Sequence, residues 1–72
     1  HTKDLSKMRE WINAYEIIIK LMEQNHVSTE TINYIKRFMA YHSSNAAEMA
    51  IEQENIMYKK EFQDIMKQYK KE

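Results

Sequence analysis

The stretch LSKMREWINAYEIIIKLM, residues 5–22, decides the fold class of this chain. Its apolar residues recur at alternating steps of three and four, which is the spacing of one face of an α-helix. This face is formed by Leu5, Met8, Ile12, Tyr15, Ile19 and Met22. Trp11 and Ile18 lie beside the face on a helical wheel and widen it. Because Asp4 is a good N-cap, we expect a first helix over about 4–25.

The rest of the chain supports a helical interpretation, because its 72 residues include neither glycine nor proline. Glycine supplies positive φ in tight turns, and proline interrupts regular structure. A chain that lacks both has few means of forming hairpins between strands. The sequence therefore predicts an all-α fold of helices joined by short polar linkers.

A second helix is expected over about 29–41. Ser28 is a good N-cap, and the charge of Glu30 in the first turn favours the helix dipole. The polar run 42–45, His-Ser-Ser-Asn, is rich in side chains that compete for backbone hydrogen bonds, and we place a helix break there. A last helix is then expected over about 46–71. The apolar spacing also crosses 42–45 without losing phase, which leaves open a continuous helix over 29–71.

These lengths predict one helical domain over 1–72, either a small three-helix bundle or a helical hairpin with a long C-terminal helix. A last helix of about 26 residues spans about 39 Å, whereas the first spans about 33 Å. The excess would expose apolar side chains at the C-terminal end, and such surfaces usually have a partner. A core this small usually needs additional stabilisation, and because cysteine is absent disulfide bonds cannot supply it. We therefore expect dimerisation to complete the fold, with the C-terminal helix at the interface.

Charge and hydropathy limit the class of protein. Eleven lysines and arginines balance eleven acidic residues. No apolar run approaches the roughly 20 residues that a membrane span needs. We expect a cytoplasmic protein with no membrane partner.

Metal and catalytic chemistry have incomplete motifs. Glu23 and His26 have the Glu-x-x-His spacing of di-iron bundles, but the second copy of that motif is missing. Met39 and His42 share a helical face, yet Met49 lies about 10 Å further along the helix, too far for one shared ion. Without glycine the chain has no phosphate-binding loop of the Walker type. The sequence predicts a protein that is not an enzyme and has no cofactor or metal.

The function that the sequence favours is protein–protein interaction. Aromatic residues and methionine are enriched at interfaces. We expect a small module, a regulator or inhibitor of the kind that phages and plasmids encode, which acts through an amphipathic helix face on another protein and on itself. The predicted interface residues are Trp11, Tyr15, Tyr58, Phe62, Ile65, Met66 and Tyr69.

The alternative is a DNA-associated regulatory protein, a dimeric helical bundle that contacts phosphates with C-terminal lysines. Residues 59–72 contain five lysines and three acidic residues. The lysines are Lys59, Lys60, Lys67, Lys70 and Lys71. The balanced total charge lacks the basic excess of a nucleic-acid binder, so this remains the alternative. Steep loss of affinity with salt would distinguish it from an apolar interface.

Overall fold

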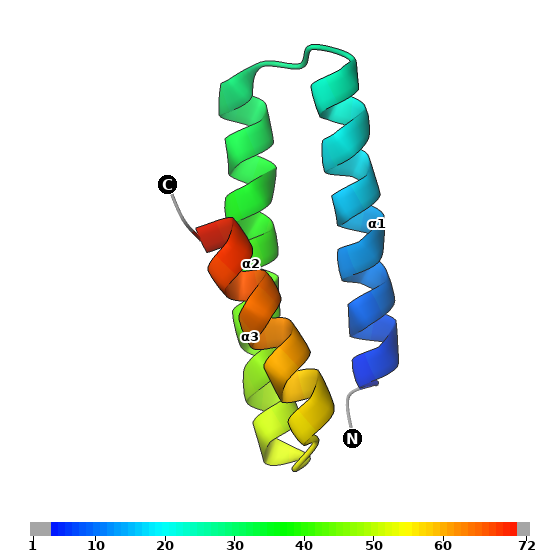
Figure 1. Cartoon of the computed structure of the whole chain (residues 1–72), viewed down its shortest axis with the longest axis vertical. Coiled ribbons are helices and arrows are strands. Elements are labelled where there is room, and N and C mark those ends of the chain that lie inside the picture. The colour runs from blue at the N-terminus through cyan, green and yellow to red at the C-terminus, as the bar shows by residue number, and fades with distance from the viewer. Residues whose placement is uncertain (1–3, 71–72) are drawn as a thin grey trace.

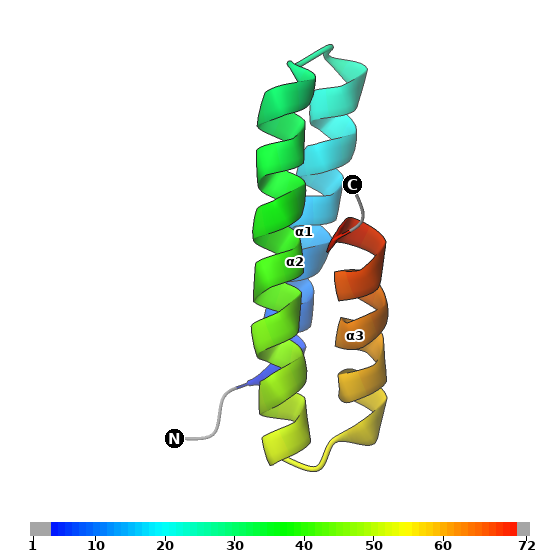
Figure 2. The ribbon, with the colours of Figure 1, turned by 90° about the vertical axis from the view of Figure 1, so that its left-hand side faces the viewer.

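The computed structural model describes residues 4–70 and consists there of three helices without strands (Figure 1). The helices are α1 (Leu5–Gln24), α2 (Thr29–Glu52) and α3 (Ile56–Lys70). α1 and α2 form an antiparallel hairpin, and α3 folds back along the half of α2 that is nearer the second turn (Figure 2). The chain measures 40 × 22 × 18 Å along its principal axes. The expectation of an all-α fold with a small helical bundle is confirmed.

Each helix begins at a side chain that caps its free backbone N–H groups. Asp4 Oδ1 accepts hydrogen bonds from the backbone N–H groups of Ser6 and Lys7, at 3.1 and 3.3 Å. Ser28 Oγ accepts one from the backbone of Thr31, at 3.3 Å. These two caps are those that the sequence predicts. The third cap was not predicted.

Asn55 is that third cap. Its Oδ1 accepts a hydrogen bond of 3.0 Å from the backbone N–H of Tyr58. The same residue also closes the end of α2, because its own N–H donates to the carbonyl oxygen of Ala50 over 2.8 Å. One asparagine thus ends one helix and begins the next, which allows the short turn that returns α3 onto α2.

Both turns use a left-handed residue that is not glycine. His26 follows α1 with φ of 59°, and Glu54 follows α2 with φ of 57°. In the first turn the N–H of Val27 donates to the carbonyl oxygen of Met22 over 3.0 Å, and the second turn repeats this pattern. These are the hydrogen bonds of a Schellman motif, in which the left-handed position is usually glycine. The chain therefore forms its turns at a conformational cost.

The predicted helix break at 42–45 is wrong, and the continuous helix over 29–71 is wrong as well. α2 passes through these residues and ends at Glu52, so the last helix has 15 residues and does not begin at 46. The ring of His42 packs edge-on against Phe38 with centroids 4.4 Å apart, and Ser43 is fully buried. Packing on both sides of the helix overrides the weak helix propensity of this polar run.

The core is a single cluster to which all three helices contribute. Its buried members are Leu5, Ile12, Ile19, Ile32, Met39, Ala46, Ala47, Ala50, Phe62 and Ile65. α2 makes its most extensive contact with α3. Small buried side chains recur along α2 at steps of three and four, at Ala40, Ser43, Ala47 and Ala50. Small residues at this spacing let α3 approach closely.

Candidate functional site

An apolar groove lies between α1 and α2. Its volume is about 480 Å³, and the residues that line it come from these two helices alone. They are Met8, Trp11, Ile12, Ala14, Tyr15, Ile18, Met39, His42 and Ala46. A hollow of this size and composition is typical of sites that receive apolar groups.

The groove opens on the side of the hairpin that α3 does not cover. Two α1 residues contact α3: Arg9 Nε lies 3.4 Å from Glu61 Oε1, and Glu16 accepts a hydrogen bond from the Tyr69 hydroxyl. Trp11 and Ile18 each follow one of these residues by two positions. Two positions correspond to about 200° around an α-helix. The groove and α3 therefore lie on opposite sides of the hairpin.

Apolar side chains stand exposed around the groove. On α1, the side chains of Trp11, Ile18 and Leu21 are 61%, 43% and 52% exposed. On α2, Tyr34 and Tyr41 are 63% and 65% exposed. Single exposed apolar residues are ordinary, but several on the two helices that form an apolar groove are typical of an interaction site.

We call this surface the groove face. From their spacing relative to the groove residues on each helix, we assign to it Trp11, Ala14, Ile18 and Leu21 of α1 with Tyr34, Phe38, His42, Asn45 and Met49 of α2. All nine residues are uncharged when histidine is neutral. Charge is also depleted from the cores of known protein interfaces.

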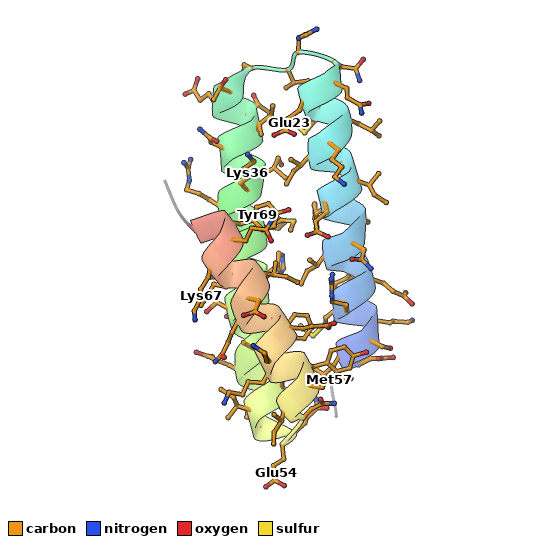
Figure 3. All side chains as sticks on the ribbon, viewed as in Figure 1. Glu23, Lys36, Glu54, Met57, Lys67 and Tyr69 are labelled. Atoms are coloured by element: carbon orange, nitrogen blue, oxygen red, sulfur yellow. The ribbon has the colours of Figure 1, made fainter. Side chains whose placement is uncertain are left out.

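The side that faces α3 has a different character. Beyond the end of α3, Lys36 Nζ lies 3.4 Å from Glu23 Oε2, and this ion pair joins α2 to α1 (Figure 3). The uncovered part of that side is thus occupied by charged groups that are already paired. An apolar partner bound on this side would remove water from these charges at a cost in free energy. Such a partner would therefore favour the groove face.

Aromatic contacts hold the α2 wall of the groove in place. The Tyr15 and Phe38 rings meet edge to face with centroids 5.5 Å apart. Phe38 in turn contacts His42, and the centroids of the His42 and Tyr41 rings lie 6.1 Å apart. Edge-to-face pairs of this kind prefer a defined geometry. The wall therefore presents a fixed shape to a partner.

The structure separates the predicted interface residues into two groups. Trp11 and Tyr15 lie together at the groove. The C-terminal group does not join them. It packs where α3 meets the hairpin, with Phe62 fully buried and Ile65 7% exposed. This corrects the expectation that Phe62 and Ile65 project from an overhanging helix.

The remaining C-terminal residues support the same correction. Tyr58 is half-buried and stacks on Phe62, with centroids 5.7 Å apart. Met66 is half-buried, and the hydroxyl of Tyr69 donates to Glu16 Oε2 over 3.2 Å. The overhang is absent because the chain turns at 53–55 and leaves α3 shorter than α2. Leu21, Tyr34 and Tyr41 were not among the predicted interface residues. Leu21 could have been predicted from the sequence, because its spacing from Trp11 and Ile18 places it on the same face of the helix.

The lysines of the alternative function do not gather into one patch among the described side chains. Lys59 lines a second hollow of about 510 Å³ at the turn between α2 and α3, with neighbours that include Ile51 and Ile56. Lys60 Nζ lies 3.7 Å from Asp64 Oδ2. Lys67 is exposed, whereas the side chain of Lys70 and all of Lys71 lie outside the described part of the chain. This arrangement gives little support to phosphate binding.

The incomplete metal motif is also dispersed. Glu23 pairs with Lys36, and His26 occupies the left-handed position of the first turn. Across residues 4–70, no group of three or more histidine or acidic side chains is placed to hold a metal ion. None of the helices in that range is both long and apolar enough to pass through a bilayer.

The comparisons with known proteins place this chain in no family. It matches no protein-family model, and neither a curated protein nor a solved structure shows significant similarity to it.

Proposed function

We propose that this chain is a small non-enzymatic interaction module that binds a protein partner through the groove face. The observation that supports the proposal is an exposed tryptophan, Trp11, beside an apolar groove on an uncharged surface. Tryptophan and tyrosine are the residues most enriched among the energetic hot spots of interfaces. The proposal keeps the class of function that the sequence favours. Of the predicted interface residues it keeps Trp11 and Tyr15 of α1, and it replaces those of α3 with residues of α2.

The groove suits an amphipathic helix. Such a helix presents side chains at steps of three, four and seven to a hydrophobic groove. On this chain the exposed α1 positions 11, 14, 18 and 21 have that same spacing, so a second helix can pack along them. The exposed Tyr34 and Tyr41 would keep their hydroxyls in water while their rings cover the contact. A module that covers its partner's surface in this way can act as a regulator or inhibitor of that partner.

Two adjacent isoleucines provide a matched test. Ile18 belongs to the groove face, whereas Ile17 is 60% exposed and points about 100° away around α1. The chain carrying Ile18→Glu or Ile17→Glu would be immobilised beside the unchanged chain and exposed to a cell extract. We expect a bound protein to be retained by the unchanged chain and by Ile17→Glu, and lost with Ile18→Glu. Equal retention by both variants would contradict the proposal.

A further inference from the structure

We infer that the partner of the groove face is a second copy of this chain, related by a two-fold axis parallel to the helices. In this dimer α1 of each copy lies on α2 of the other, and the two hairpins form a four-helix arrangement. The inference depends on the proposed function, because it names the partner of the same surface. It replaces the dimer through the C-terminal helix that the sequence predicted.

The size of the face fits a stable dimer. The plane that contains α1 and α2 is the broad plane of the molecule, about 40 Å by 22 Å. Along the length of α1, about 30 Å, this width gives a footprint of roughly 660 Å². Stable interfaces bury about 600–1,000 Å² on each partner. Nearly the whole back of the hairpin would be used, which suits two equal hairpins better than one short peptide helix.

The heights of the side chains along the hairpin fit this symmetry. A two-fold axis parallel to the helices keeps every residue at its own height. Within one copy, Ala14 and His42 line the same groove, and Tyr15 touches Phe38. In the dimer, Phe38 of the second copy would therefore lie at the height of Tyr15, and the small Ala14, one residue away, would face that ring. A small residue opposite a large one allows the two layers to interdigitate.

Two opposite charges at one end of the groove face favour the same two-fold axis parallel to the helices. Lys7 precedes Trp11 by four positions and Ala14 by seven, so it extends the α1 side of the face. Glu52 follows Met49 by three positions and Asn45 by seven, so it extends the α2 side at the same end of the hairpin. Both are exposed. In the proposed dimer Lys7 of each copy and Glu52 of the other lie toward the same end of the interface, so their opposite charges attract across it.

The other two-fold arrangement of these faces lacks this pairing. An axis perpendicular to the helices would place α1 on α1 of the second copy in the opposite direction, and Lys7 would meet the apolar region near Met22. Opposite charges across an interface fix its register and exclude competing arrangements. The chain also has no net charge at pH 7, so two copies do not repel each other as whole molecules.

Sedimentation equilibrium over a wide concentration range tests the inference, with the emission of Trp11, the single tryptophan, as a second measurement. We expect a dimer whose formation shifts the Trp11 emission to the blue. Ile18→Glu should leave a folded monomer by circular dichroism, and Ile17→Glu should still dimerise. A monomer at all concentrations, or equal weakening by both variants, would overturn the inference.

A charge exchange tests the arrangement of the two copies. Lys7→Glu and Glu52→Lys should each weaken dimerisation about threefold, because each replaces two attractions between exposed opposite charges with repulsions. The double variant should restore most of the loss, since both pairs re-form with exchanged signs. If the double variant is weaker than either single variant, the parallel two-fold axis is incorrect.

The two proposals can fail separately. A monomeric chain that retains a different protein in a manner sensitive to Ile18→Glu would overturn the second copy as partner and leave the proposed function standing. A monomeric chain with no partner sensitive to Ile18→Glu would remove both.

Discussion

The hydroxyl of Tyr69 donates a hydrogen bond of 3.2 Å to Oε2 of Glu16, which links the end of α3 to the middle of α1. A second polar contact joins the same two helices, between Arg9 and Glu61 at 3.4 Å. Burial, together with the charge of Glu16, raises the pKa of Tyr69 above its ordinary range. These contacts hold α3 on the side of the hairpin opposite the groove face.

The first prediction concerns the pH dependence of Tyr69. Its pKa is higher in the folded chain than in the unfolded one, so its contribution to stability is complete below about pH 10 and is lost as the pH rises through the folded pKa. Tyr69→Phe should lower the free energy of unfolding by about 0.5–1 kcal/mol at pH 7. Between pH 9 and 11 the difference from the unchanged chain should shrink. Urea unfolding at several pH values measures this.

Tyr34→Phe is the control for that prediction. Tyr34 is 63% exposed, and its substitution should change stability little at any pH. If Tyr34→Phe and Tyr69→Phe give the same pH profile, the hydrogen bond to Glu16 contributes nothing specific.

The second prediction is that Ser43→Ala stabilises the chain. The Oγ of Ser43 is fully buried and has no hydrogen-bond partner among the described residues. A buried hydroxyl without a partner costs about 1–3 kcal/mol relative to a satisfied one, and alanine removes it with little loss of volume. We expect the free energy of unfolding to rise by about 1 kcal/mol. Ser6→Ala should instead destabilise the chain, because Ser6 Oγ donates to the cap Asp4 over 2.8 Å.

Ser43 also shows what could be predicted of the fold. The first helix was expected at 4–25 and is observed at Leu5–Gln24, because its stripe and its cap both lie in local sequence. At 42–45 local preference and tertiary packing disagree, and packing prevails. A serine inside a helix is buried only where another element packs over it, and α3 is the element in most extensive contact with α2. That contact could not be inferred before the second turn was located.

The sequence at the turn between α2 and α3 does contain one indication that a helix begins there. Asn55 precedes the apolar Ile56 and Met57, and asparagine is a strong N-cap. Without glycine at position 54, the usual mark of a helix end was missing. Misplacing this turn also misplaced the site, because it made Phe62 and Ile65 look exposed. Trp11 and Tyr15 line one groove, because both lie on a single helix whose limits are indicated by local sequence.

The third prediction concerns the left-handed turn residues. Glu54→Gly should raise the free energy of unfolding by roughly 0.5–1 kcal/mol, because glycine adopts positive φ without the strain of a Cβ atom. His26→Gly should act in the same direction in the first turn. Thermal unfolding followed by circular dichroism measures both. Glu48→Gly, an exposed change inside α2, should lower stability by about as much. A loss with Glu54→Gly would show that its conformation is not strained.

The last prediction distinguishes core from surface on α3. Phe62→Ala should lower the free energy of unfolding by about 3–5 kcal/mol, because a fully buried aromatic ring leaves a cavity. Met57→Ala removes a side chain that is 66% exposed on the same helix and should cost less than about 1 kcal/mol. Urea unfolding of the two variants measures the difference. If Phe62→Ala left stability unchanged but altered self-association, Phe62 would belong to an interface, and the packing of α3 on the hairpin described above would be incorrect.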